Sequence, residues 1–162
     1  MLNEVIENTE RFIASVPKAK RKKYGQFFTN STTAKFMASL FCFDLSKRKI
    51  EILDAGAGTG ILAAAVVQKL YELGYVGKIY VTCYETDELV MPLLEENMAL
   101  CNKLHNVYYT IKRENYVTSQ NFSNSTSFNN EDYQYDYIIG NPPYMKIAKD
   151  AAEALAMPEV CY

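Results

Sequence analysis

The feature that most constrains the fold is a glycine-rich turn between two apolar stretches. The turn, Asp54-Ala55-Gly56-Ala57-Gly58-Thr59-Gly60, follows the short apolar stretch 50–53 and precedes 61–73, which is rich in alanine and leucine. Glycines let the backbone turn sharply and let a ligand approach more closely than a Cβ atom would permit. The pattern therefore predicts a strand, a ligand-binding turn and a helix.

Strands and helices are predicted to alternate after this turn. Residues 78–84, 107–111 and 135–139 have the composition of strands, and residues 87–100 that of a helix between the first two. Such repetition predicts an α/β fold: a parallel sheet with right-handed crossovers and helices on both of its faces. The polar tract 119–132 is expected to be a surface loop, because it has little to bury.

Two helices are predicted ahead of the sheet. The first covers residues 2–16 and ends at Pro17. The second begins after an N-cap at 30–32 and should bury Phe36, Met37, Leu40 and Phe41. We expect residues 1–45 to form an N-terminal segment on one α/β domain at 46–162.

Composition excludes several classes of protein. A net charge of −2 gives no global basic field for nucleic acid, but it does not exclude such a partner, because the binding charge can be local or come from another module. Five basic residues cluster at 18–23, as either a solvated run or a phosphate contact. Four scattered cysteines and one histidine argue against a metal site or a disulfide framework. The N-terminus lacks a signal-peptide pattern, so a cytoplasmic location is expected.

Two carboxylates suggest the ligand of the turn. Asp54, expected at the mouth of the turn, would repel a pyrophosphate but attract a ligand with an ammonium and a sulfonium, such as S-adenosylmethionine. Glu85 follows the second strand at about the offset of a ribose-binding acid, or else is a plain helix-start acid. Glu114 and Asn115, after the third strand, either bind an adenine ring or belong to an ordinary loop.

The tetrapeptide Asn141-Pro142-Pro143-Tyr144 follows the fourth strand. It is either a strand-ending turn or a rigid set of acceptors for an exocyclic amine. The Asn141 side-chain oxygen and the Pro142 carbonyl could hold the two N–H groups of an adenine amine, and Tyr144 could stack on the base. Because strands of a parallel sheet end at one edge, we expect this tetrapeptide and the glycine turn to share one crevice.

These segments together resemble the adenine-N6 DNA methyltransferases of restriction–modification systems. Gly25-Gln26-Phe27-Phe28-Thr29 looks like the family's N-terminal cofactor loop, 54–60 its glycine motif, Glu85 its ribose acid and 141–144 its catalytic tetrapeptide. The resemblance implies a Rossmann-like fold, S-adenosylmethionine as cofactor and DNA as substrate. The implied catalytic residues are Asn141, Pro142 and Tyr144; the implied cofactor contacts are Gln26, Phe27, Phe28, Thr29, Asp54, Ala55, Gly56, Gly58, Gly60, Glu85, Glu114, Asn115 and Asn141.

The chain also departs from this family. Asn30 stands where the family usually has proline, and Asn115 and Tyr116 follow Glu114 in place of the usual acid–aromatic pair. The family's sheet has seven strands, of which about four are expected here, without the target-recognition domain. Methylation of a protein glutamine or of RNA is the alternative, as is a cofactor-binding module that needs a specificity subunit. We expect the exposed sheet edge to drive self-association, unless residues 145–162 cover it.

Overall fold

The computed structural model describes residues 1–17, 28–119, 135–141 and 151–156, and its centre is a four-stranded sheet. The strands are β1 (Lys49–Ala55), β2 (Lys78–Tyr84), β3 (Val107–Lys112) and β4 (Tyr137–Ile139). All three pairings are parallel, and the strand order is β3-β2-β1-β4. The strand order therefore reverses direction between β1 and β4, which is where sheets of this kind bind ligands.

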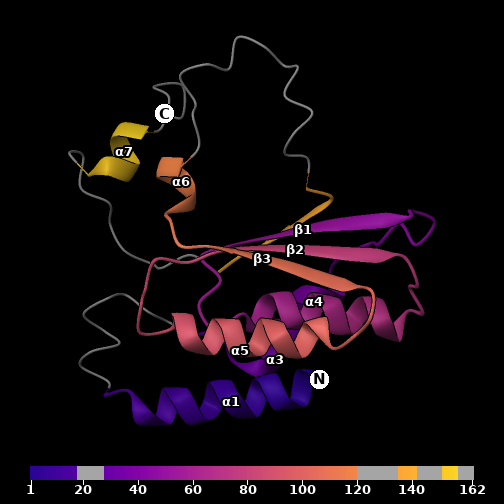
Figure 1. Cartoon of the computed structure of the whole chain (residues 1–162), viewed down its shortest axis with the longest axis horizontal. Coiled ribbons are helices and arrows are strands. Elements are labelled where there is room, and N and C mark those ends of the chain that lie inside the picture. The colour runs from indigo at the N-terminus through magenta and orange to yellow at the C-terminus, as the bar shows by residue number, and fades with distance from the viewer. Residues whose placement is uncertain (18–27, 120–134, 142–150, 157–162) are drawn as a thin grey trace.

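Helices pack on this sheet in two layers. The helices α4 (Ile61–Glu72) and α5 (Met91–Asn102) lie against one face, and α1 (Leu2–Ser15) lies outside them, packed on both (Figure 1). The helix α3 (Ser31–Ser39) packs mainly on α4. The short helices α6 (Tyr116–Ser119) and α7 (Ala152–Ala156) contact each other above the sheet in this view.

The four longer helices thus share one face of the sheet, whereas the sequence predicted helices on both. The reason is the strand order: the connections from β1 to β2 and from β2 to β3 step in the same direction across the sheet. Right-handed crossovers that step in one direction place their helices on the same face. The connection from β3 steps back to β4, and much of it, residues 120–134, lies outside the described residues.

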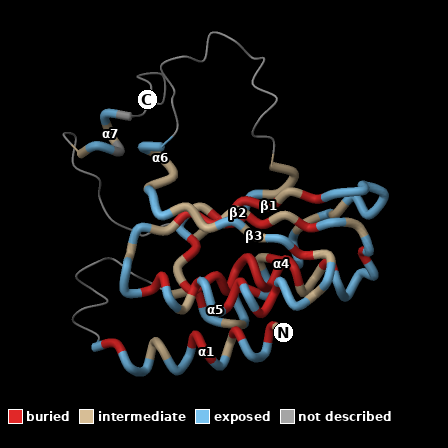
Figure 2. The backbone as a smooth tube through the Cα atoms, in the orientation of Figure 1, coloured by how far each residue is buried: buried red, intermediate tan, exposed pale blue. Residues whose placement is uncertain are grey.

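Burial along the strands follows this one-sided arrangement (Figure 2). In β1, Ile50 and Ile52 are fully buried toward the helices, and β2 contributes Ile79 and Val81 in the same way. On the other face Tyr80 stacks on Tyr108 with ring centroids 5.1 Å apart, and Ile138 of β4 is 59% exposed. The main core therefore lies between the sheet and α4 and α5.

The N-terminal helices follow the prediction only in part. The side chain of Asn30 accepts a hydrogen bond from the Thr33 amide at 2.8 Å and caps α3 as expected. Phe36 and Leu40, however, are 60% and 64% exposed. The buried positions of α3 are Ala34 and Ala38, because small side chains allow it to approach α4 closely.

The helix predicted at residues 87–100 begins later in the structure, as α5. Residues 87–90 form turns ahead of α5, and Asp87 accepts hydrogen bonds there from the amide of Leu89, through its side chain, and of Val90. The helix proper starts at Met91, with Pro92 in its first turn. Among the described residues, no helix has the length and apolar character needed to cross a membrane.

Candidate active site

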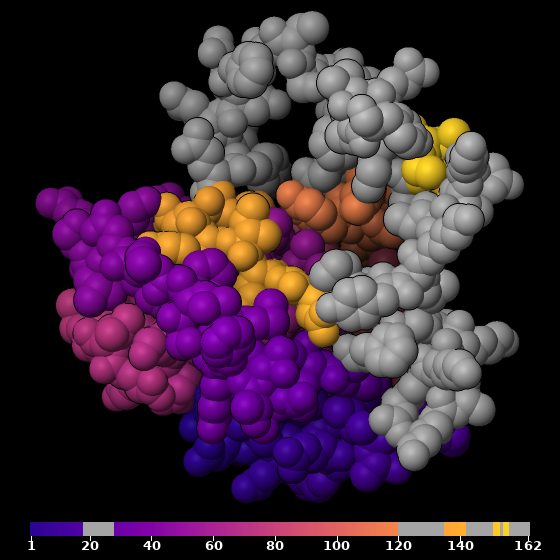
Figure 3. Space-filling model, turned by 180° about the vertical axis from the view of Figure 1, so that it is seen from behind, coloured from indigo at the N-terminus to yellow at the C-terminus, as the bar shows by residue number. Residues whose placement is uncertain are grey.

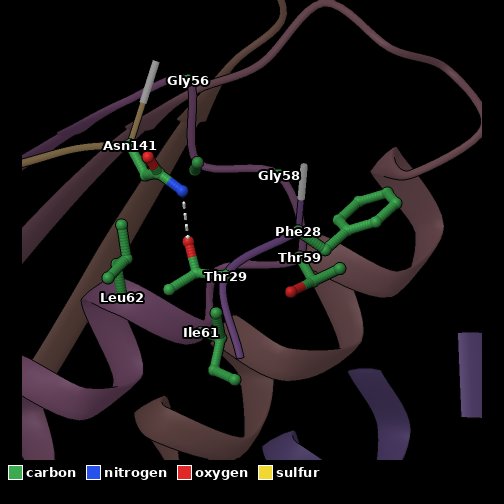
Figure 4. Close-up of a pocket in the computed structure, with 9 residues that line it drawn as sticks. Phe28, Thr29, Gly56, Gly58, Thr59, Ile61, Leu62 and Asn141 are labelled. Atoms are coloured by element: carbon green, nitrogen blue, oxygen red, sulfur yellow. Dashed lines mark hydrogen bonds between the residues drawn. The ribbon is translucent and has the colours of Figure 1, made fainter. Parts of the chain in front are cut away.

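A pocket opens at the carboxyl ends of β1 and β4, where the strand order reverses. Its empty volume, counted together with the space open to solvent, is about 280 Å³. The pocket brings together the N-terminal loop, the glycine turn, the start of α4 and the residue after β4 (Figure 4). The lining residues are Phe28, Thr29, Gly56, Ala57, Gly58, Thr59, Ile61, Leu62 and Asn141.

The glycine turn forms one wall of this pocket. Gly56 and Gly58 have φ values of +85° and +55°, in the left-handed region that favours glycine. The amides of Gly56 and Ala57 both donate to the Tyr84 carbonyl at 2.9 Å, which ties the turn to the end of β2. A Cβ atom built at Gly56 would have no atom within 4 Å, so the turn faces open space there.

Glu85 holds the same turn through its carboxylate. Oε2 accepts a hydrogen bond from the Gly58 amide at 2.7 Å. Oε1 accepts from the amides of Thr86 and Asp87 at 2.7 and 2.8 Å. A carboxylate has about four acceptor positions, so these bonds leave capacity for about one more. Glu85 thus holds the glycine turn and also accepts hydrogen bonds from the first residues of the segment that leads to α5.

Asp54 lies beneath the turn and not at its mouth, where the sequence placed it. The alternation of β1 points its side chain to the same face as Ile50 and Ile52, and Asp54 is 0% exposed. One oxygen, Oδ2, accepts from the Ala63 amide at 3.2 Å, while Oδ1 has no hydrogen-bond partner among the described residues. Burial raises the pKa of this carboxyl to about 7, and the nearby Glu85 adds to the rise.

Asn141 forms the facing wall. In the sheet Asp54 pairs with Ile139, so two further residues on each strand bring Gly56 and Asn141 to the same edge. The Nδ2 atom of Asn141 donates to Oγ1 of Thr29 at 3.0 Å, and Thr29 is itself buried. In Figure 4 the amide oxygen points away from Thr29. The expected meeting of the glycine turn and the asparagine is therefore present in the structure.

The surface view agrees with this arrangement. Seen from behind, residues 135–141 (orange) lie beside residues from the first third of the chain (violet) in Figure 3. The contact is specific: the Tyr137 hydroxyl accepts a hydrogen bond from the Asp44 amide at 2.8 Å. β4 is thus anchored by the loop after α3 as well as by its pairing with β1.

The other residues predicted for the site either do not line the pocket or lie outside the described residues. Glu114 is exposed, and the Asn115 side chain accepts from the Val117 amide at 2.9 Å at the start of α6, so neither lines the pocket. Ala55 and Gly60 belong to the backbone of the turn, and a Cβ at Gly60 would face α5. Gln26, Phe27, Pro142 and Tyr144 lie outside the described residues.

Some lining residues were not predicted. Ala57 and Thr59 lie inside the recognised turn, and Ile61 and Leu62 form the first residues of α4. Their position at a helix start after a ligand-binding turn was the available signal. Within the described ranges, no cluster of His, Cys, Asp and Glu could hold a metal ion.

Two of the curated proteins to which this chain is similar are methyltransferases that it matches over most of its own length. The type II methyltransferase M.PstI of Providencia stuartii is 33% identical over 144 residues, which are 86% of this chain and 28% of that protein. A release factor glutamine methyltransferase of Fusobacterium nucleatum is 36% identical over 121 residues, 74% of this chain and 28% of that protein. The chain thus spans less than a third of the length of either relative.

A solved structure and a family model complete the comparison. The methyltransferase subunit of a type I restriction–modification system from Streptococcus thermophilus has a TM-score of 0.53 at 21% identity, over 73% of this chain and 23% of that one. This likeness supports the Rossmann-like methyltransferase fold, here with four parallel strands. The model of the family "N-6 DNA Methylase" matches residues 5–154. The chain therefore belongs to the N-6 DNA methylase family.

Proposed function

We propose that this chain carries the cofactor site and the catalytic asparagine of an enzyme that methylates the N6 amine of adenine in DNA, with S-adenosylmethionine as the donor. One observation carries the proposal: Asn141 and the glycine turn line the same pocket. A methyl donor held by the turn would then lie next to an amine held by the asparagine. Membership of the N-6 DNA methylase family supports the same activity.

The residues in and next to the pocket fit this cofactor. The open space at Gly56 admits a ligand close to the backbone, and the remaining acceptor position of Glu85, which adjoins the lining, suits one ribose hydroxyl. The buried Oδ1 of Asp54 lies beneath the turn and outside the lining of the pocket, so it would accept a hydrogen bond from a bridging water and not from the ligand itself. When bound, S-adenosylmethionine supplies a methyl group on a sulfonium, which is an electrophile.

Asn141 has the task of orienting the amine. The lone pair of an adenine amine is delocalised into the ring, so the nitrogen is a weak nucleophile. An amide oxygen that accepts one N–H, together with the Pro142 carbonyl for the other, would bias the nitrogen toward tetrahedral geometry. The hydrogen bond from Nδ2 to Thr29 orients the Asn141 oxygen away from Thr29. Rate enhancement then comes from positioning. The nitrogen is cationic once it has taken the methyl group and is then acidic enough to lose one proton to water, so no general base is needed.

The target base must leave the duplex for this reaction. An amine within stacked and paired DNA cannot reach a pocket at the end of a sheet, so we propose that the adenine is flipped out. Tyr144, three residues after Asn141, is the proposed stacking partner. Recognition of the DNA sequence is proposed to come from other parts of the protein or from a specificity subunit.

Glutamine methylation is the second candidate, because a release factor glutamine methyltransferase is 36% identical over 121 residues. A glutamine amide nitrogen is also planar and needs the same orienting acceptors. The described residues of the pocket suit either nitrogen, the adenine amine or the glutamine amide. Only the substrate separates the two activities.

The test is methyl transfer from labelled S-adenosylmethionine, with unmethylated plasmid DNA and a release factor as competing substrates. Label in N6-methyladenine of the DNA is expected, and Asn141→Ala should abolish it while weakening cofactor binding much less than Glu85→Ala does. Glu85→Ala should weaken cofactor binding at least tenfold, in line with a lost charge-assisted hydrogen bond. Label in the release factor alone would replace DNA with protein as the substrate. Cofactor binding without transfer would favour the dependent-module alternative.

We also propose that chains associate through β4. This strand has three residues and pairs with β1, and its Ile138 side chain is 59% exposed. An edge of this kind offers unpaired backbone groups to a second chain. Light scattering should show a mass above that of the monomer, and Ile138→Lys should reduce it.

A further inference from the structure

A buried polar network links α1 and α5 to the glycine turn. Its centre is Thr59, between Gly58 and Gly60 in the turn. The Thr9 hydroxyl of α1 donates to the Thr59 hydroxyl at 3.1 Å. The Asn97 side chain of α5 donates to the Thr59 carbonyl at 2.8 Å. The turn is thus held by two helices that are distant from it in sequence.

The network joins the two helices to each other and reaches the surface at Asn8, whose side chain also bonds to Glu96 and Arg11. Asn8 of α1 donates to Oδ1 of Asn97 at 3.1 Å, so the two helices are also joined to each other. Asn8 is 5% exposed, Thr9 and Thr59 are each 1% exposed, and Asn97 is fully buried. Buried polar groups are costly unless they are hydrogen-bonded, and a satisfied network fixes one arrangement of the elements that it joins.

The same helix reaches the pocket at a second point. Phe12, one helical turn after Asn8, contacts the ring of Phe28 edge to face, with centroids 5.7 Å apart. Phe28 lines the pocket, as does Thr59. α1 therefore contacts two lining residues, Phe28 and Thr59, without lining the pocket itself.

The turn needs such support because of its composition. Three of its residues, Gly56, Gly58 and Gly60, have positive φ values, and glycine permits many other conformations. Tyr84 and Glu85 fix the turn from the end of β2. Thr59 is the residue through which α1 and α5 fix it from beneath.

We propose that Thr9 and Asn97 are positioning residues of the cofactor site: through Thr59 they hold the glycine turn in the form that accepts S-adenosylmethionine. The inference rests on the proposed function for its ligand, and on the hydrogen bonds of Thr59 for its mechanism. It assigns to the N-terminal helix a part in cofactor affinity, although α1 contributes no residue to the lining of the pocket.

The test compares Thr9→Val, which removes the hydroxyl at nearly constant volume, with Thr9→Ser, which keeps it. The matched control is Val5→Ala, because Val5 is a fully buried residue one turn earlier on α1 and outside the network. Two quantities are measured well below the unfolding temperatures: the dissociation constant for S-adenosylmethionine by calorimetry, and the hydrogen-exchange rates of the amides of residues 56–60.

Thr9→Val is expected to weaken cofactor binding about fivefold, the equivalent of one buried hydrogen bond, and to speed amide exchange in the turn. Thr9→Ser should restore both values. Val5→Ala should lower the melting temperature at least as much while leaving both values unchanged. Thr9→Ala, which favours the helix, serves as a second variant if Thr9→Val does not fold.

Two results would overturn the inference. One is equal changes in Val5→Ala and Thr9→Val, which would reduce the network to general stability. The other is unchanged exchange and unchanged affinity in both Thr9→Val and Thr9→Ala. A wild-type chain that does not bind S-adenosylmethionine would contradict the proposed function instead, and the exchange rates would still test the network.

Discussion

The two walls of the pocket are built in different ways. The glycine wall is a flexible sequence fixed by hydrogen bonds from β2, α5 and α1. The asparagine wall follows a three-residue strand, and its side chain donates to the N-terminal loop at Thr29. Both walls depend on segments distant in sequence, but the glycine turn is held by buried side chains of two helices, whereas the half-buried Asn141 bonds to a loop residue. Changes to the glycine wall should therefore alter stability more than changes to the asparagine wall, whose main effect, under the proposed function, is on the geometry of methyl transfer.

The largest effects on stability are expected at two carboxylates, one near each wall, and the two effects have opposite signs. Asp54 lies under the glycine wall, with a pKa raised by burial to about 7 from 3.8. The folded protein therefore binds this proton more tightly than the unfolded chain, and stability falls as the pH rises from about 4 to about 7. Asp54→Asn should be more stable than the wild type by up to about 4 kcal/mol above pH 8, and by little near pH 4. Urea unfolding across this pH range measures the difference.

Asp136, just before β4, is the matched control. Burial raises the pKa of its carboxyl, but hydrogen bonds from Lys47 and from the Glu51 amide outweigh burial, and the pKa is lowered. Its stabilising effect is present above its usual pKa and is lost as the pH falls through the lowered value. Asp136→Asn should thus be less stable than the wild type at neutral pH. The same sign for both variants would contradict the contrast between the two walls.

A smaller effect is expected for alanine at Gly60. A Cβ there would lie 2.8 Å from both Leu94 Cδ1 and Met98 Cε, at a φ of +77°. Gly74 has nearly the same φ, +75°, and no atom within 4 Å of a built Cβ. Gly74→Ala should lose about 1–2 kcal/mol of unfolding free energy from the backbone alone. Gly60→Ala should lose more, because α5 must also shift. Equal losses in urea unfolding would show that α5 does not restrain the turn.

The smallest effect on stability is expected for the hydrogen bond between Thr29 and Asn141. Thr29→Val removes the acceptor of the Asn141 amide and should cost about 1 kcal/mol of unfolding free energy, whereas Thr29→Ser should cost less. The side-chain amide resonances of Asn141, assigned by their loss in Asn141→Asp, should shift in Thr29→Val and stay near their wild-type positions in Thr29→Ser. Unchanged resonances in Thr29→Val would mean that Thr29 does not orient the asparagine.

Local patterns were sufficient to predict the sheet. The strand at Lys78–Tyr84 was predicted with its observed bounds, and the fourth strand was predicted two residues too early at its start. The meeting of Gly56 and Asn141 followed from a general property of parallel sheets, since their strands end at one edge. These features depend on the order of the elements along the chain.

Features that depend on packing were not predicted. Asp54 was expected at the mouth of the turn, although alternation from Ile50 and Ile52 already indicated the helix-covered face. The exposure of Phe36 follows from the close approach of α3 to α4, which a hydrophobic pattern does not reveal. The bond between Asn8 and Asn97 joins residues 89 positions apart, and no local signal marks it.

The pairing of Asp54 with Ile139 has a consequence for which changes the chain can tolerate. Gly56 and Asn141 each lie two positions beyond that pair, so their proximity depends on a count of residues. Removing one residue between Tyr137 and Asn141 would draw the asparagine back by about 3.3 Å and turn it to the opposite side. A changed side chain at the exposed Ile138 would keep this count, whereas an insertion or deletion would move Asn141 away from the glycine turn. In this segment, length is under stricter constraint than composition.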